Sequence, residues 1–212
     1  YPLFKSFALK HQQQLKQIFL EKLVQTNEVR RSAYLYPLIA SIYEHEQKPL
    51  AIIEIGTSAG LLLTLDHYNY QYNNDLFINL HEHPFTIHSV NNGNPLPISM
   101  TNKPEIKERI GIDLNVVDLQ NPDEYCWMQA LIWPEHQERR QQFIEAKAIN
   151  DTVKKVMIEG DAIQLLPKAI QQINKNHQIV IFHTHVANQL PKEVKKSLID
   201  VLKNESKLRP LY

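Results

Sequence analysis

The first residues that could carry chemistry lie in the stretch IIEIGTSAGLLLTLDHY, residues 52–68. An apolar run ends in a glutamate, passes through a glycine turn and continues as a second apolar run. Turns of this kind bind phosphates, bind nucleosides or present a nucleophilic serine. A P-loop needs a lysine after its last glycine, and here Leu61 follows Gly60, so the phosphate-binding loop is excluded.

The sequence GTSAG at 56–60 also fits the Gly-x-Ser-x-Gly elbow of serine hydrolases, with Ser58 as the nucleophile. Possible triad partners follow in the right chain order, Asp113 or Asp161 and then His183 or His185. In that fold several strands precede the elbow, whereas here the preceding segment has a helical pattern and no His-Gly-Gly stretch. A serine hydrolase is therefore our third hypothesis.

A third interpretation starts from Glu54, which ends the apolar run and gives Glu-x-Gly-x3-Gly with Gly56 and Gly60. The two glycines let the backbone curl around a ligand, and a following helix would offer free amides. A carboxylate at this place would repel a pyrophosphate but suits a cationic or hydroxyl-bearing ligand. The turn therefore favours a nucleoside-type ligand.

Two further acids follow the next predicted strands. Asp113 ends the second core strand, where an acid can bind ribose hydroxyls. Asp161, in Gly160-Asp161-Ala162, follows the third strand and opens a helix, where it could equally be a plain N-cap. Three acids at the ends of three successive strands predict one shared binding site.

The elements that must position these acids follow from hydrophobic periodicity. A helical N-terminal cap is expected over 1–48, with helices at 4–25 and 32–46, followed by an α/β domain over 49–212. The core strands are expected at 50–55, 109–115, 153–161 and 177–185, and the helices at 59–72, 122–131, 134–148, 162–173 and 192–203. A β-hairpin with its loop, at 76–100, is expected as an insertion over about 75–101.

This alternation predicts an open, doubly wound, mostly parallel sheet with strand order 3-2-1-4, whose ligand lies at the carboxyl ends of the strands. KLRPLY at the end of the sequence has the pattern of a fifth core strand. We therefore expect the C-terminal strands of the sheet to be missing from these 212 residues.

Composition limits the partners. The 43% apolar residues are enough for a packed core, and 23 basic residues balance 23 acidic ones. This balance argues against nucleic acid and membrane surfaces as partners. A single cysteine, Cys126, indicates a cytoplasmic protein, and the ten histidines show no spacing typical of a metal site. We expect a small-molecule ligand and no metal.

The glycine turn resembles the first motif of class I S-adenosylmethionine-dependent methyltransferases, except that Ser58 stands where those enzymes usually have another glycine. EIGTSAGLLL, RIGIDLNVVDL, ALIWPEHQERR, EGDA and VIFHTHVAN, preceded by TNEVRRSAYLYPLI, together resemble a bacterial family of uncharacterised proteins known as domain of unknown function 2332. The resemblance spans nearly the whole chain. It implies a class I methyltransferase-like Rossmann fold with a helical N-terminal portion and a longer protein, but it supplies no reaction.

By this resemblance S-adenosylmethionine is the expected cofactor. Its binding residues would be Glu54, Gly56, Thr57, Ser58, Gly60, Asp113, Leu114, Asp161 and Ala162. The leading hypothesis is an S-adenosylmethionine-dependent methyltransferase for an unknown small molecule. The alternative is a non-catalytic nucleoside-binding or regulatory module with the same fold.

In class I methyltransferases the end of the fourth strand faces the substrate, and here it carries His183 and His185. Either histidine could act as a base, and strand alternation would place both on one face; both could equally be ordinary polar residues ending a strand. Candidate substrate-binding residues are Trp133, Glu135, Arg139 and Asn188. Arg30 and Arg31 would lie near the mouth of the site if the N-terminal helices cap it.

Overall fold

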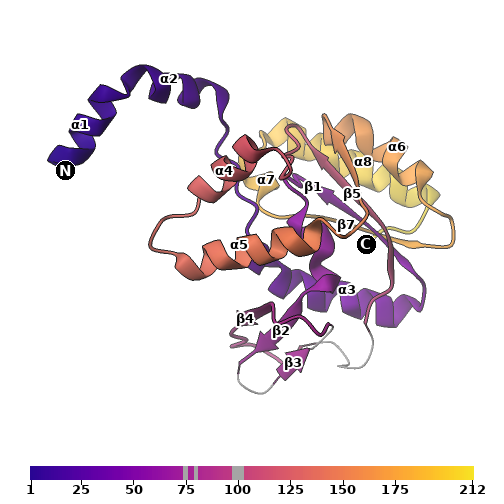
Figure 1. Cartoon of the computed structure of the whole chain (residues 1–212). Helices are drawn as coiled ribbons and strands as arrows, with labels where there is room; N and C mark the ends of the chain where they lie inside the picture. Colours follow the sequence, from indigo (N-terminus) through magenta and orange to yellow (C-terminus); the bar gives the residue numbers. More distant parts are fainter. Residues whose placement is uncertain (74–75, 79–80, 97–102) are drawn as a thin grey trace.

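A four-stranded parallel sheet forms the centre of the protein (Figure 1). The structure is a computed structural model that describes residues 1–73, 76–78, 81–96 and 103–212. The strands, in spatial order, are β6 (Val156–Glu159), β5 (Ile106–Asp113), β1 (Leu50–Ile55) and β7 (Gln178–His183). Every neighbouring pair is parallel. The predicted strand order 3-2-1-4 is confirmed.

Both faces of this sheet are covered by helices, as expected for a strand that is apolar at nearly every position. On one face Leu50 and Ile52 of β1 belong to a core that includes residues of α3 (Ser32–Glu46) and α5 (Gln137–Asn150). On the other face Ala51, Ile53 and Ile55 pack with α6 (Ala162–Gln172) and α8 (Lys192–Leu208). The sheet is therefore doubly wound, and its strand ends are held between two packed layers.

The N-terminal lead consists of two short helices that extend away from the body of the protein (Figure 1). The predicted helix at 4–25 is interrupted at His11, which separates α1 (Pro2–Lys10) from α2 (Gln12–Glu21). Neither helix has a buried residue. The 3₁₀ helix η1 (Val29–Arg31) then leads into α3, which has the predicted bounds.

The predicted helix at 59–72 is wrong. The turn leads instead into the 3₁₀ helix η2 (Leu61–His67) and then into strand β2 (Asn69–Tyr72). The alternating tyrosines explain the strand, because Tyr70 and Tyr72 point to one buried side and the Tyr70 ring stacks on Tyr36 of α3 at 4.7 Å. Tertiary packing of aromatic rings overrides the helical pattern here.

β2 belongs to a second, three-stranded sheet outside the core sheet. It lies between β3 (Leu76–Ile78), with which it is antiparallel, and β4 (Thr86–Ser89), with which it is parallel. The two predicted hairpin strands therefore pair with β2 and not with each other. Residues 74–75, 79–80 and 97–102 of the predicted insertion lie outside the described residues.

The remaining elements lie close to their predicted places. α4 (Pro122–Ala130) and α5 connect β5 to β6, although α5 begins at Gln137 and not at 134. α7 (Val186–Gln189) is a single short turn after β7. Of the predicted fifth strand, Leu211 forms one parallel bridge to Ile179 of β7. Within the described ranges no helix is both long and apolar enough to cross a membrane.

Candidate functional site

A cavity of about 510 Å³ lies at the carboxyl ends of the core strands. In parallel α/β sheets this edge is the place where ligands bind. All four strand ends contribute to its wall, and the segment ahead of η1 closes it from the side. The strand-end residues are Ile55, Gly56, Ser58, Ile112, Asp113, Leu114, Gly160, Asp161, Ala162, Ile163, Thr184, His185 and Val186.

The turn after β1 has three residues in the left-handed region, Gly56 at φ 75°, Ser58 at φ 52° and Gly60 at φ 75°. A Cβ atom at position 56 would lie 2.1 Å from Cγ2 of Val186 in α7. Gly56 is thus required both by its backbone angle and by the close approach of α7. Ser58 adopts the conformation that favours glycine in spite of its side chain.

The amides of this turn are bound within the protein. Ser58 donates its backbone N–H to Oδ2 of Asp113 at 2.7 Å. Asn27 accepts the N–H of Leu61 at 2.9 Å and donates its side-chain amide to the carbonyl of Thr57 at 3.2 Å. The free amides expected at a helix N-terminus are therefore absent at Ser58 and Leu61, and the turn holds its shape without a ligand.

Glu54 lies beneath the turn and not in the cavity wall. Its side chain is fully buried, and Oε2 accepts a hydrogen bond from Thr57 Oγ1 at 2.9 Å. Oε1 has no partner among the described residues. Burial, with a smaller contribution from the charge of Asp113, raises the pKa of Glu54 to about 8 in spite of the hydrogen bond from Thr57 and the charge of Arg31, which both lower it. Glu54 is therefore a neutral acid at pH 7.

Two other predicted cofactor residues also lie outside the cavity wall. Thr57 is buried, and its side chain occupies the space beside Gly111 of β5, where a Cβ atom would lie 2.6 Å from it. Gly60 faces the side chains of Met157 and Lys155. Thr57 and Gly60 therefore support the shape of the turn without contributing to the cavity wall.

The acids at the ends of β5 and β6 do line the cavity. Asp113 accepts from two backbone amides, those of Ser58 and of Asn115, the latter at 3.0 Å. Asp161 caps α6 by accepting the N–H of Ile163 at 2.9 Å. Carboxylate oxygens have about four acceptor positions in all, so both side chains keep capacity for a ligand hydroxyl or amine. Leu114 and Ala162, also predicted, lie beside them in the wall.

The structure separates the two predicted catalytic histidines. His185 lines the cavity, at φ 66° before α7, whereas His183 is the exposed last residue of β7 and does not line it. The predicted common face does not form, because the strand ends at His183 and the chain turns at Thr184.

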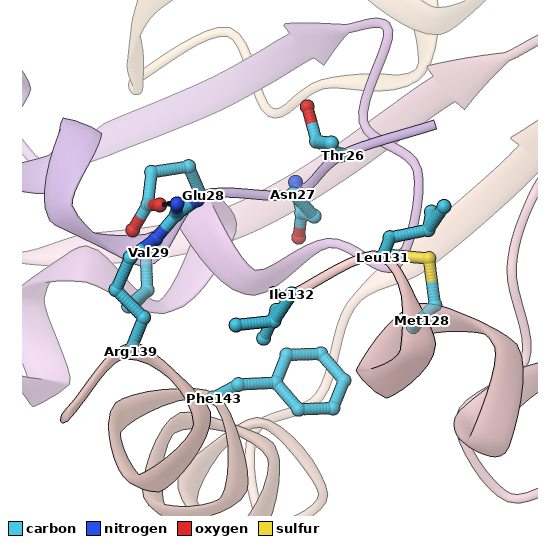
Figure 2. A pocket seen from close by; sticks show the side chains of 9 residues that line it. All are labelled: Thr26, Asn27, Glu28, Val29, Met128, Leu131, Ile132, Arg139 and Phe143. Atoms are coloured by element: carbon cyan, nitrogen blue, oxygen red, sulfur yellow. Dashed lines mark ion pairs between the residues drawn. The ribbon is translucent and has the colours of Figure 1, made fainter. Parts of the chain in front are cut away.

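The predicted substrate-binding residues do not reach the cavity. Arg139 lies in a separate small pocket of about 30 Å³, where its side chain forms an ion pair with Glu28 (Figure 2). Trp133 is 70% exposed in the connection between α4 and α5, and Glu135 and Asn188 are exposed as well. Trp133 and Arg139 are close together in the sequence, which suggested that they share the wall of the ligand pocket. In the structure neither residue lines the cavity at the strand ends.

The segment 22–26, which we call the strap, closes one side of the cavity with Val24, Gln25 and Thr26. Lys22 of the strap forms an ion pair with Asp123, and other hydrogen bonds also hold the strap to the body. The indole N–H of Trp127 donates to the carbonyl of Leu23 at 2.8 Å, and Gln25 and Asn115 exchange two hydrogen bonds of 3.0 Å. No local sequence pattern indicated the strap, because its partners lie about 90 to 100 residues away along the chain.

Arg31 also lines the cavity, although the sequence analysis placed it near the site only on the condition that the N-terminal helices cap it. It lies in the wall and donates from Nη1 to Thr184 Oγ1 at 3.0 Å. Its neighbour Arg30 turns away and forms an ion pair with Glu138 at 2.8 Å. The pair of arginines ahead of α3 was a usable signal, but only the fold decides which of the two faces the cavity.

Within the described ranges no three His, Cys, Asp or Glu side chains are placed to hold a metal ion. The nearest approach to a cluster is a column of His67, His81 and His83, whose rings stack with centroids 5.2 and 5.3 Å apart. Nε2 of His81 and Nε2 of His83 contact backbone carbonyl oxygens at 3.0 and 2.8 Å. The column is therefore a packing feature of the second sheet.

The chain belongs to the bacterial protein family described as "Uncharacterized protein conserved in bacteria (DUF2332)", which matches residues 1–212. The family suggested by the sequence motifs is thus confirmed. Neither a curated protein nor a solved structure matches the chain.

Proposed function

We propose that the cavity binds S-adenosylmethionine and that the protein is a methyltransferase for a small molecule. One observation carries this proposal: the glycine turn, Asp113 and Asp161 open into a single cavity across three strand ends. The strand order β6-β5-β1-β7 is consistent with a class I methyltransferase-like Rossmann fold. A cavity of about 510 Å³ is within the usual range for cofactor-sized ligands.

The turn fits the methionyl end of this cofactor. Ser58 holds φ 52° at the place where the first methyltransferase motif usually has another glycine, so the backbone takes the glycine-like path. Ser58 Oγ is buried in the cavity wall and has no hydrogen-bond partner among the described residues. A buried hydroxyl without a partner is costly, and a ligand polar atom would relieve that cost.

The adenosine end would lie over β5 and β6. Asp113 would accept hydrogen bonds from the ribose hydroxyls, and Asp161 is placed to accept from the exocyclic amine of adenine. Leu114, Ala162 and Ile163 supply apolar surface for the flat ring at the same end of the cavity. At this end of the cavity the wall thus offers polar groups for the ribose and the amine of a nucleoside and apolar surface for its ring.

When bound, the cofactor would supply a methyl group on a sulfonium. An acceptor atom would attack this methyl carbon in line and displace the sulfonium sulfur as a neutral thioether. The protein's contribution is to hold the reactants close and to exclude water. His185 is placed in the cavity wall to take the proton that the acceptor loses as its bond to the methyl carbon forms. His183 is not placed for this role.

Calorimetric titration with S-adenosylmethionine and S-adenosylhomocysteine tests the proposal. We expect both to bind the wild-type protein, and Asp113→Asn to weaken binding by roughly 1–3 kcal/mol, because buried ligand hydroxyls lose a charged acceptor. Asp200→Asn, at an exposed position of α8, is the matched control and should bind as wild type. Absence of binding to the wild-type protein, or unchanged binding by Asp113→Asn, would refute the proposed site.

The second candidate function is a binding or regulatory module that uses the same cavity without chemistry. It is favoured by the exposure of His185 and by the fact that His183 lies outside the cavity wall. Ligand binding without methyl transfer to any acceptor would select this alternative.

The serine hydrolase is disfavoured by geometry. Ser58 is only 1% exposed, and its hydroxyl is bonded to no histidine among the described residues. A nucleophilic serine needs a base within hydrogen-bond reach. Ser58→Ala would abolish an esterase, whereas it would only weaken cofactor binding, through the loss of one hydrogen bond to the ligand.

A further inference from the structure

The cavity is charged differently at its two ends. Asp161 and Asp113 follow β6 and β5, while Arg31 is bonded to Thr184 after β7, and β6 and β7 are the opposite outer strands of the core sheet. A ligand that fills the cavity therefore meets carboxylates at one end and a guanidinium at the other.

The guanidinium of Arg31 has only neutral hydrogen-bond partners. Besides Thr184, it donates from Nη2 to Thr26 Oγ1 at 3.5 Å, at the long limit of a hydrogen bond. Among the described residues, no carboxylate lies within ion-pair distance of Arg31. Arg30, in contrast, is bonded to Glu138 and to Gln142 at 2.7 Å.

The acid that interacts with Arg31 through space does not cancel its charge. That acid is Glu54, which is buried behind the turn and holds its proton at neutral pH because burial raises its pKa to about 8. Among the described residues, the half-buried guanidinium in the cavity wall therefore has only neutral hydrogen-bond partners and can still bind an anion. A guanidinium binds a carboxylate through two parallel hydrogen bonds, which Thr26 and Thr184 cannot provide.

We propose that Arg31 binds a carboxylate of the ligand and so selects ligands that carry an amino-acid part at this end of the cavity. This inference rests on the proposed function, because there the group is the α-carboxylate at the methionyl end of S-adenosylmethionine. Thr184 holds the guanidinium in place, and the weakly held Nη2 turns from Thr26 to the carboxylate. The adenosine part is bound independently of Arg31, over Asp113 and Asp161.

Two ligands separate these contributions. S-Adenosylhomocysteine carries the carboxylate, and 5′-methylthioadenosine has the same adenosine and thioether without the amino-acid part. Calorimetry with both ligands should show that Arg31→Gln weakens S-adenosylhomocysteine binding roughly 10–100-fold, as expected for a lost charge-assisted hydrogen-bond pair. Binding of 5′-methylthioadenosine should change less than about twofold, which also shows that the variant is folded.

Arg31→Lys should give an intermediate loss, because an ammonium keeps the charge but not the planar fork. Arg30→Gln makes the same charge change one residue away, outside the cavity wall, and should bind both ligands as wild type.

Three results would overturn the proposal. If Arg31→Gln binds S-adenosylhomocysteine as tightly as wild type, Arg31 does not bind the carboxylate, although the proposed function stands. If it loses both ligands equally, Arg31 only fastens the strap to the end of β7. If the wild-type protein binds neither ligand, the proposed function itself fails.

Discussion

Replacing Glu54 by glutamine should remove a large part of the pH dependence of stability. The folded protein holds Glu54 protonated with a pKa of about 8, whereas the ordinary pKa of a glutamate is 4.5. Between these two values the folded state binds one proton more than the unfolded state. The contribution of Glu54 to stability is therefore fully present below about pH 4.5 and is lost as the pH rises through about 8.

The size of the effect follows from the pKa difference. At 1.36 kcal/mol per pKa unit, a shift from 4.5 to about 8 corresponds to about 5 kcal/mol over the whole range. Between pH 5 and pH 8 the wild-type free energy of unfolding should fall by about 3–4 kcal/mol more than that of Glu54→Gln. No reduction for solvent screening applies, because Glu54 is fully buried.

Urea denaturation of both proteins at pH 5, 6, 7 and 8 measures this difference. Subtracting the two curves removes the contributions of other titrating groups that both proteins share. Glutamine has nearly the same shape and keeps an acceptor for Thr57, so the slope with pH is the diagnostic quantity and not the absolute stability. Parallel curves, within about 0.5 kcal/mol across the range, would show that Glu54 is ionised in the folded protein and would refute the reasoning.

Three further outcomes are expected. Asp66→Asn should lower the free energy of unfolding by about 3–5 kcal/mol in urea denaturation, because it leaves the buried Arg109, bonded to both Asp66 oxygens at 2.7 Å, without its counter-charge. Asn27→Ala should cost about 1–3 kcal/mol in the same assay, since it leaves the buried N–H of Leu61 without its acceptor and removes one of the two hydrogen bonds to the Thr57 carbonyl, which keeps that from Gly60. His185→Asn should lower methyl transfer while cofactor binding stays near wild type, since asparagine tolerates the left-handed angle at this position; unchanged turnover would remove His185 as the base.

Much of the central fold could be predicted because the strand β1 is buried on both faces. A continuous apolar run such as LAIIEI indicates a central parallel strand, and the alternation of strands and helices then restricts the order of the sheet. The positions of Asp113 and Asp161 followed from the same logic, since the carboxyl ends of parallel strands share one edge.

The predictions differ from the structure where contacts between residues far apart in the sequence determine the local structure. After Gly60 the run LLLTLDH could continue as a helix, but Tyr72 donates to the carbonyl of Ala33 in α3 at 2.7 Å and commits the chain to a strand. For the site, Arg139 was predicted from its sequence neighbours, and the structure places it in a separate pocket, paired with Glu28. Arg31 and the strap reach the cavity through contacts that no local pattern contains.

The pairing of β1 has a consequence for synthesis of the chain. Leu50 pairs with Ile106 on one side and with Gln178 on the other, so the strand is made roughly 130 residues before its second partner. At ribosomal speeds of about 5–20 residues per second, LAIIEI waits roughly 6–25 s with an open edge. A short, largely apolar segment with three β-prone isoleucines is the kind of segment that aggregates during such a delay.

Glu54 is the one charged residue in this run. In the nascent chain its carboxyl group has an ordinary pKa and is negatively charged, and a charge within an apolar segment opposes stacking with other chains. When β1 is enclosed, the same carboxyl takes up a proton and is buried as a neutral group beneath the glycine turn. We therefore expect the charge of Glu54 to oppose aggregation of the strand before folding and to be lost as the sheet closes around it.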